Sequence, residues 1–190
     1  MDSRTHTILW RRLDVPGHEH ARLTLDRTNW HLTGAAVFVE DGQPTRLEYL
    51  VVCDARWHTL AGRIKGWIGD TGVDLAIDAD GEGRWRINGT EVPDVIGCLD
   101  LDLSFSPSTN LLPIRRLDLA VGGSDSVRSA WLRFDPEPRL EPLRQRYQRV
   151  SENTYRYESP SHDFTGEIRV NEAGLVVRYS GLWEIETASG

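Results

Sequence analysis

The segment from Cys98 to Leu117, CLDLDLSFSPSTNLLPIRRL, holds the densest set of side chains that could do chemistry. Asp100 and Asp102 are two residues apart, so an extended strand would place both carboxyls on one face. On an outer face they would be solvated charges; in a cavity they could anchor a polar group or act as an acid/base pair. The adjacent Arg115 and Arg116 could grip an anionic ligand head or clasp the two carboxyls internally.

The same segment must also bend. Thr109 and Asn110 supply local hydrogen bonds for an ordered turn. We expect a short, irregular helix around 108–117, capped by Ser108 or Thr109 and interrupted by Pro113. This helix or loop would position the two arginines relative to the carboxyls.

Aromatic residues form a second candidate set, because the chain has seven Trp. They could pack in the core, or they could line a wide cavity for an apolar or sugar-bearing ligand. Trp57 and Trp67, with Tyr49 from an apolar run upstream, join the candidate ligand-binding residues.

Other motifs give little support for catalysis or for a cofactor. His18-Glu19-His20 lacks further metal ligands nearby in sequence, so we interpret it as a solvated loop. Cys53 and Cys98 form no CxxC pair and are expected to be buried, inert thiols. Nucleophile-elbow, phosphate-loop and dinucleotide-binding motifs are missing from the sequence. We therefore predict no catalytic residue, no metal and no cofactor.

The charge and composition of the chain exclude some classes of binding partner. The 190 residues carry 22 Lys+Arg against 29 Asp+Glu, a formal net charge of −7, which argues against a nucleic-acid-binding protein. No apolar run is long enough for a transmembrane helix, and the N-terminal residues do not resemble a signal peptide. We expect a cytoplasmic protein with a single domain over residues 1–190.

The spacing of turn residues predicts an all-β fold. Runs rich in Val, Ile, Leu, Trp, Tyr and Thr are separated by short turns such as Asn88-Gly89 and Asn171-Glu172-Ala173-Gly174. Alternation is clear in 99–105, 72–78 and 164–170. We expect about eleven strands in a large, curved antiparallel sheet that forms a barrel or half-barrel with one short helix or loop plug.

Two of these runs are apolar on both faces. Leu32–Val39 and Leu47–Cys53 have little polar material on either side, so one face would line the interior and a helix, loop or ligand would cover the other. Gly62, Gly66 and Gly69 in the next run indicate bends or close approach by another backbone segment.

Three stretches resemble the bacterial putative glycolipid-binding family: CLDLDLSFSPSTNLLPIRRL, LEYLVVCDARWHTLAGRIKGWIG at 47–69, and the hairpins of 163–183. The resemblance implies an antiparallel β-barrel-like domain, similar to bacterial lipoprotein and lipid carriers, in which a curved sheet wraps an apolar cavity. The residues that match the family stretch most closely are Asp100, Asp102, Thr109, Asn110, Arg115 and Arg116.

Three hypotheses for function follow. The first is a binding protein for an amphipathic small molecule or lipid, such as a glycolipid or fatty-acyl compound. The second is a small-molecule enzyme that uses Asp100 or Asp102 as a base, with His58 or Arg115 nearby. The third is a structural or interaction protein that oligomerises through strand edges or an exposed apolar face.

Overall fold

The computed structural model describes residues 5–190, and most of them lie in β-strands. Fifteen strands join in one sheet. The strands are β1 (Thr5–Arg12), β2 (Gly17–Asp26), β3 (Asn29–Glu40), β4 (Gln43–Cys53), β5 (Thr59–Ile68), β6 (Thr71–Ala79), β7 (Trp85–Ile87), β8 (Thr90–Glu91), β9 (Asp100–Leu103), β10 (Ser124–Arg133), β11 (Arg139–Ser151), β12 (Thr154–Ser159), β13 (Phe164–Val170), β14 (Val176–Tyr179) and β15 (Trp183–Ser189). The described helical elements are η1 (Pro93–Val95), η2 (Ser108–Asn110), α1 (Leu111–Leu117) and η3 (Pro160–His162).

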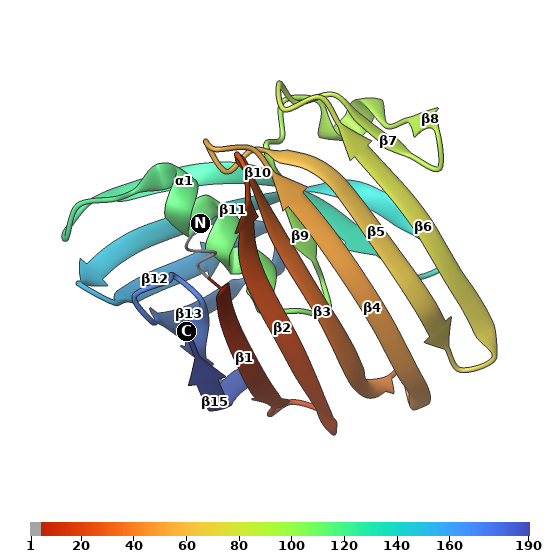
Figure 1. Ribbon diagram of the computed structural model, residues 1–190, viewed down its shortest axis with the longest axis horizontal. Helices are drawn as coiled ribbons and strands as arrows, with labels where there is room; N and C mark the ends of the chain where they lie inside the picture. Colours follow the sequence, from red (N-terminus) through yellow and green to blue (C-terminus); the bar gives the residue numbers. More distant parts are fainter. Residues whose placement is uncertain (1–4) are drawn as a thin grey trace.

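The sheet is strongly curved but does not close. Its order is β8-β7-β6-β5-β4-β3-β2-β1-β15-β14-β13-β12-β11-β10-β9, so β8 and β9 are its two edges. Figure 1 shows β1–β6 as one curved wall, with β10–β12 passing behind it and α1 near one end. The predicted mainly-β half-barrel with one short helix is confirmed, although fifteen strands replace the expected eleven or so.

Strand directions depart from the prediction at a single place in the described chain. Each pairing is antiparallel except that of β10 with β9, which is parallel. The chain between these two strands contains η2 and α1, and it makes the crossover that parallel pairing requires. The first and last strands are also neighbours, because β1 pairs with β15.

The segment that contains β9 runs along the concave side of the sheet. The Thr59 amide donates to the Leu99 carbonyl, and the Leu101 amide donates to the Thr59 hydroxyl. Gly62 permits this approach, since a Cβ there would lie 2.8 Å from Leu101 Cδ2. The group that approaches Gly62 is thus a side chain, and not the backbone that the sequence pattern predicted.

The outward face of β3 and β4 is less covered than expected. Tyr49 and Val51 are buried on the inward face, as alternation requires. Val37 of β3, however, is 58% exposed, so the expectation of a covering helix or loop is wrong there. Val37 pairs with His18 of β2 and with Arg46 of β4, so the outward face beside Val37 is partly polar.

The helix differs from the prediction in its cap and its proline. Asn110 is the N-cap residue and makes no side-chain cap bond; the Thr109 hydroxyl instead accepts a hydrogen bond from the Leu103 amide. Pro113 does not interrupt α1, because it is the third helical residue. A proline is tolerated in the first turn, where backbone N–H groups have no partner within the helix.

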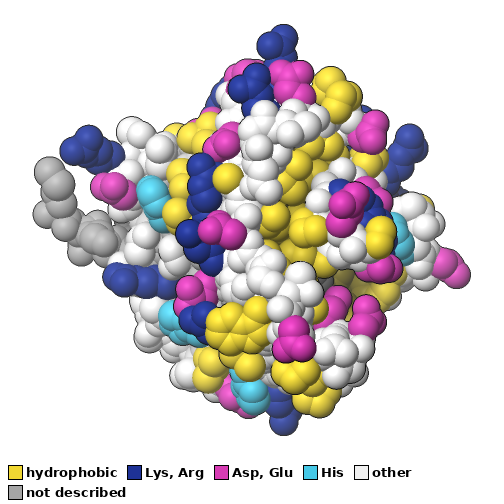
Figure 2. Space-filling model, turned by 90° about the vertical axis from the view of Figure 1, so that its right-hand side faces the viewer, with side chains coloured by type: hydrophobic (Ala, Val, Ile, Leu, Met, Phe, Trp, Pro, Cys, Tyr) yellow, Lys and Arg dark blue, Asp and Glu magenta, His cyan; other side chains and the backbone are white. Residues whose placement is uncertain are grey.

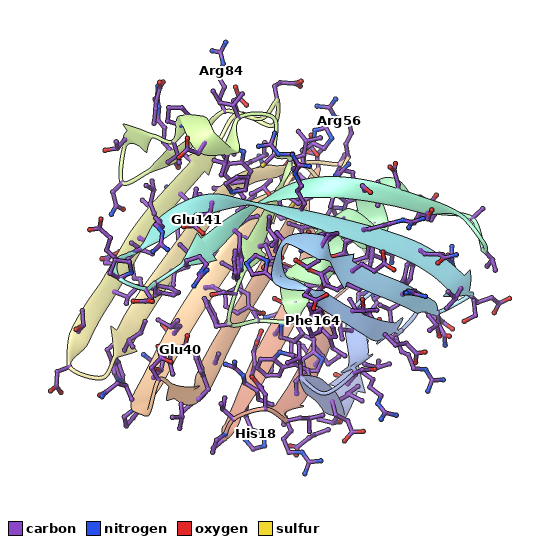
Figure 3. The ribbon with its side chains drawn as sticks, turned by 180° about the vertical axis from the view of Figure 1, so that it is seen from behind. His18, Glu40, Arg56, Arg84, Glu141 and Phe164 are labelled. Carbon is purple, nitrogen blue, oxygen red and sulfur yellow. The ribbon has the colours of Figure 1, made fainter. Side chains whose placement is uncertain are left out.

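The surface on the side of the molecule that lies at the right in Figure 1 is mixed. Figure 2 shows hydrophobic side chains gathered at the middle of this face, between clusters of charged ones. In Figure 3, Phe164 lies near the middle of the molecule, whereas Arg84 and His18 lie toward opposite ends. Among residues 5–190, no helix is long and apolar enough to cross a membrane.

Candidate functional site

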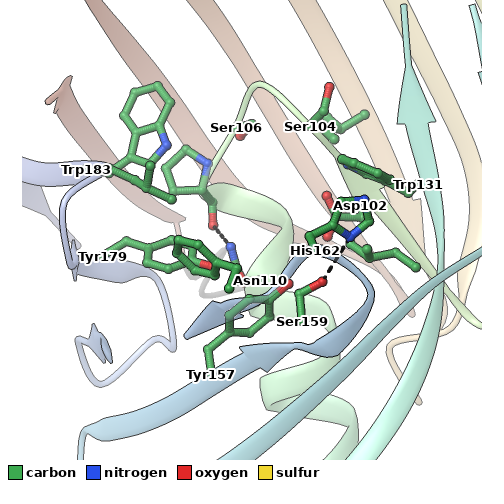
Figure 4. Close-up of a pocket in the computed structure, with 15 residues that line it drawn as sticks. Asp102, Ser104, Ser106, Asn110, Trp131, Tyr157, Ser159, His162, Tyr179 and Trp183 are labelled. Carbon is green, nitrogen blue, oxygen red and sulfur yellow. Dashed lines mark hydrogen bonds between the residues drawn. The ribbon is translucent and has the colours of Figure 1, made fainter. Parts of the chain in front are cut away.

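A cavity of about 300 Å³ lies where the β9–η2 segment meets β10–β12, η3, β13 and the β14–β15 turn (Figure 4). Its walls combine aromatic rings with a few polar groups. The lining residues are Asp102, Leu103, Ser104, Ser106, Pro107, Asn110, Trp131, Leu143, Tyr157, Ser159, His162, Phe164, Tyr179, Leu182 and Trp183.

One wall of the cavity is an aromatic cluster. The rings of Tyr157, Phe164 and Tyr179 meet edge to face, with centroids between 5.7 and 6.0 Å apart. Trp183 extends this wall, and Figure 4 shows it on the same side of the cavity as Tyr179. Edge-to-face packing fixes the ring orientations, which gives a preformed apolar surface.

The opposite end of the cavity is polar and centres on Asp102. Its Oδ2 accepts a 2.7 Å hydrogen bond from Nε2 of Gln145. The same amide nitrogen donates to the Tyr157 hydroxyl, while the Gln145 carbonyl oxygen accepts from Ser129. Burial raises the pKa of Asp102 to about 6, with the Gln145 hydrogen bond opposing the rise and Asp100 adding to it.

Trp131 and His162 form the rim beside Asp102. Their rings meet edge to face at 4.9 Å, and Arg133 lies over the Trp131 ring. The His162 Nδ1 is 3.3 Å from the Ser159 hydroxyl, a contact drawn in Figure 4. This rim brings a flat ring, a hydroxyl and an imidazole to the polar end of the cavity.

Behind the cavity wall lies a buried acid that sequence reasoning missed. Oε1 of Glu19 accepts hydrogen bonds from Tyr49 (2.6 Å) and Ser106 (2.5 Å), and Ser106 in turn contacts Ser108. Burial raises the pKa of Glu19 to about 8. The solvated-loop interpretation of 18–20 is wrong: the segment belongs to β2, with Glu19 inward and His18 outward. Alternation with Ala21 and Leu23 is the signal that would have revealed Glu19.

Asp100 and Arg116 form an internal clasp. Oδ1 and Oδ2 of Asp100 accept from the Arg116 guanidinium at 2.9 and 2.5 Å, and the Asp100 side chain is 1% exposed. Burial raises the pKa of Asp100, while Arg116 opposes that rise. The pair ties α1 to β9. Nearby, Asn110 accepts from the Tyr147 hydroxyl and donates to the Pro107 carbonyl.

Arg115 and Trp57 meet away from the cavity. Arg115 donates to the backbone carbonyls of Ala173 and Glu172, and its guanidinium lies 6.0 Å from the Trp57 ring. That ring stacks on Trp30. Arg115 also lines a second, more polar hollow of about 710 Å³.

Trp67 lies on the outward face of the sheet. Its side chain is 45% exposed and stacks with Arg46, in a shallow groove that includes Val37. Of the nine candidate residues from the sequence, the structure therefore places Asp102 and Asn110 at the cavity. Tyr49 is connected to the cavity through Ser106. The others lie elsewhere, namely Asp100, Thr109, Arg115, Arg116, Trp57 and Trp67.

The described part of the chain offers no metal-binding cluster and no exposed thiol. No group of three or more His, Cys, Asp or Glu residues within 5–190 is arranged to hold a metal ion. Cys53 and Cys98 are free and buried, and burial raises their pKa values to about 12 and about 11. The expectation of buried thiols is confirmed.

Comparisons with known proteins agree with this architecture. The family model described as "Putative glycolipid-binding" matches residues 7–185. The chain is also similar to the crystal structure of a DUF1089 family protein from Pseudomonas aeruginosa, at 33% sequence identity and a TM-score of 0.75, over 88% of this chain and 91% of that one. No curated protein matches the sequence.

Proposed function

Because the chain belongs to the family described as "Putative glycolipid-binding", we propose that it binds an amphipathic ligand, such as a glycolipid or a fatty-acyl compound, in the cavity around Asp102. One domain spanning the chain would form this binding unit. The family description names the ligand class, and the cavity offers a place where that class would fit.

The observation that carries the proposal is the two-sided lining of one cavity. The aromatic wall of Tyr157, Phe164 and Tyr179 suits an acyl chain or a sugar face, whereas Asp102 at the other end suits a polar head. The volume of about 300 Å³ is at the lower end for small-molecule sites, which span roughly 300–1,000 Å³. A long acyl chain would therefore extend beyond the cavity.

The structure suggests different contributions for the candidate residues. Asp102 and Asn110 would meet the ligand, together with Trp131 and Trp183 from the cavity lining. The Asp100–Arg116 clasp, with Thr109, would hold the β9–α1 segment that carries Asp102. Arg115, Trp57, Tyr49 and Trp67 would not touch a ligand in this cavity.

The enzyme alternative is weaker on the same geometry. An acid/base pair would need two carboxyls facing one substrate. Asp102 lines the cavity, but both carboxylate oxygens of Asp100 are bonded to Arg116. The geometry therefore favours binding over catalysis by that pair.

Native mass spectrometry of the purified protein, followed by lipid extraction, tests the proposal. We expect a co-purified amphipathic molecule, and we expect Leu182→Trp, which adds a ring to the cavity lining, to reduce its retention at least about tenfold. Leu25→Trp is the matched control, because Leu25 is exposed outside the cavity. Equal loss in both variants, or a wild-type protein that neither carries nor takes up any amphiphile, would contradict the proposal.

A further inference from the structure

The cavity has an unusual charge balance for a site that binds a lipid head. Asp102 is its one carboxyl-bearing lining residue within the described chain, and no Lys or Arg lines it. An anionic head would therefore face a carboxylate with no neighbouring cation directed at it.

Three arginines that contact the cavity lining or strand β9 have other partners. Arg116 is bonded to Asp100, and Arg133 lies over Trp131 and forms an ion pair with Glu141. Arg12 lies over the Trp183 ring and donates to Asp14 through Nε and Nη2, while its buried Nη1 has no hydrogen-bond partner among the described residues. These guanidinium groups support the walls, so turning one toward a ligand would break an existing contact.

A hydrogen bond from the buried Gln145 side chain fixes the orientation of the Asp102 carboxyl. Gln145 is 2% exposed, and its amide donates to Asp102 and Tyr157 while its carbonyl oxygen accepts from Ser129. Flipping the amide would turn its carbonyl oxygen toward the Asp102 carboxylate, acceptor against acceptor, so this network holds Oδ2 in one position. Within residues 5–190, no further hydrogen bond reaches the Asp102 carboxyl, which leaves it able to accept bonds from the cavity.

The polar groups around Asp102 both donate and accept. Ser104 and Ser159 present hydroxyls, and His162 presents an imidazole whose role depends on its tautomer. Hydroxyl groups of a ligand need both kinds of partner, whereas an ammonium group needs acceptors alone. The mixture therefore fits a polyhydroxyl head better than a cationic one.

On the basis of the proposed function, we propose that Asp102 is a specificity-determining residue that makes the cavity select amphiphiles with uncharged, hydrogen-bond-donating heads and reject those with phosphate or carboxylate heads. A like charge brought close to Asp102 in a partly desolvated cavity is repelled far more strongly than in bulk water. Hydroxyl donors meet the same carboxylate as a charge-assisted acceptor.

The test compares four amphiphiles with the same octyl tail: octyl glucoside, octyl phosphate, octanoate and octylammonium. Binding to the full chain is measured by calorimetry at about pH 7.5, below the critical micelle concentrations, where Asp102 is ionised. We expect octyl glucoside to bind at least about tenfold more tightly than either anionic compound. In Asp102→Asn this preference should fall to less than about threefold.

The control variant is Asp70→Asn, since Asp70 is exposed in the turn between β5 and β6. It should keep the wild-type preference. Equal binding of glucoside and phosphate by the wild type would overturn the inference while leaving amphiphile binding intact, and so would tightest binding of octylammonium. If none of the four compounds binds, the proposed function fails along with the inference. The comparison on wild-type protein stands even if Asp102→Asn does not fold.

Discussion

Gln145 donates a 2.7 Å hydrogen bond to Asp102, joining the interior of β11 to the polar end of the cavity. Gln145 is itself held by Ser129 and Tyr157, so its amide has a defined orientation. The carboxyl at the cavity is thus positioned by a buried side chain that no ligand needs to touch.

Replacing Gln145 with Leu should raise the pKa of Asp102 further above about 6, because the hydrogen bond from Gln145 favours the ionised carboxyl. Ser129 and Tyr157 would lose a partner, so the free energy of unfolding should fall by about 1–3 kcal/mol. Titration of the Asp102 carboxyl carbon by NMR gives the pKa. Gln148→Leu, on the other face of β11, should leave it unchanged; an unchanged pKa in Gln145→Leu would refute the positioning role.

Replacing Arg116 with Met should destabilise the fold by about 3–5 kcal/mol, because it leaves Asp100 charged, buried and unpaired. The double variant Asp100→Asn/Arg116→Met should recover much of that loss, since no buried charge remains. Denaturant unfolding of both variants gives the two free energies. Arg146→Met, which breaks a more exposed pair with Glu158, should cost less than about 1 kcal/mol. A double variant as unstable as the single one would show that an unpaired charge on Asp100 is not the cause of the lost stability.

Glu19 should make stability depend on pH. Its pKa is 4.5 when unperturbed and about 8 in the folded chain, so between these values the unfolded state binds fewer protons. The free energy of unfolding contributed by this group is fully present below about pH 4.5 and falls as pH rises through about 8, by roughly 3–5 kcal/mol in total.

Glu19→Gln, which mimics the protonated acid, should remove that fall and be more stable than wild type above about pH 8. Denaturant melts across the pH series check this. Glu167→Gln, at an exposed position of β13, should follow the wild-type curve. Parallel curves for wild type and Glu19→Gln would rule out a buried neutral Glu19.

Gly34→Ala should destabilise the fold by about 1–3 kcal/mol, because a Cβ there would overlap the Tyr49 ring, which holds Glu19. Gly72→Ala is the matched control, since a Cβ at that position meets nothing within 4 Å. It should be neutral or slightly stabilising. Thermal melts give the change in melting temperature of each variant. An equal change in both would contradict a role for the Gly34–Tyr49 packing in stability.

Local periodicity predicted the strands well, because alternation depends only on neighbouring residues. The run expected at 164–170 is β13, with the same bounds. Alternation counted from Gly62 and Ile64 also gives Trp67 the outward face that it occupies. Its residue type, rather than its register, suggested a place in the cavity.

Long-range arrangement was harder to predict. Asp100 and Asp102 alternate as expected, yet one meets Arg116 and the other meets a cavity. Their separate environments depend on β9 lying along the concave side beside β5, and on α1 folding back onto it. Neither contact leaves a local signal in the sequence. Gln145 shows the same limit, since its partners come from β9, β10 and β12.

The central claim is that an amphiphile enters the cavity around Asp102, and the indole N–H signals of the seven Trp residues test it most directly. Trp131 and Trp183 line the cavity, whereas Trp67 lies on the outward face and Trp57 stacks on Trp30 elsewhere. In an NMR titration with octyl glucoside, we predict saturable shifts of the Trp131 and Trp183 signals with little change in Trp67 and Trp57. Saturable shifts confined to Trp67 or Trp57, with Trp131 and Trp183 unmoved, would contradict the account.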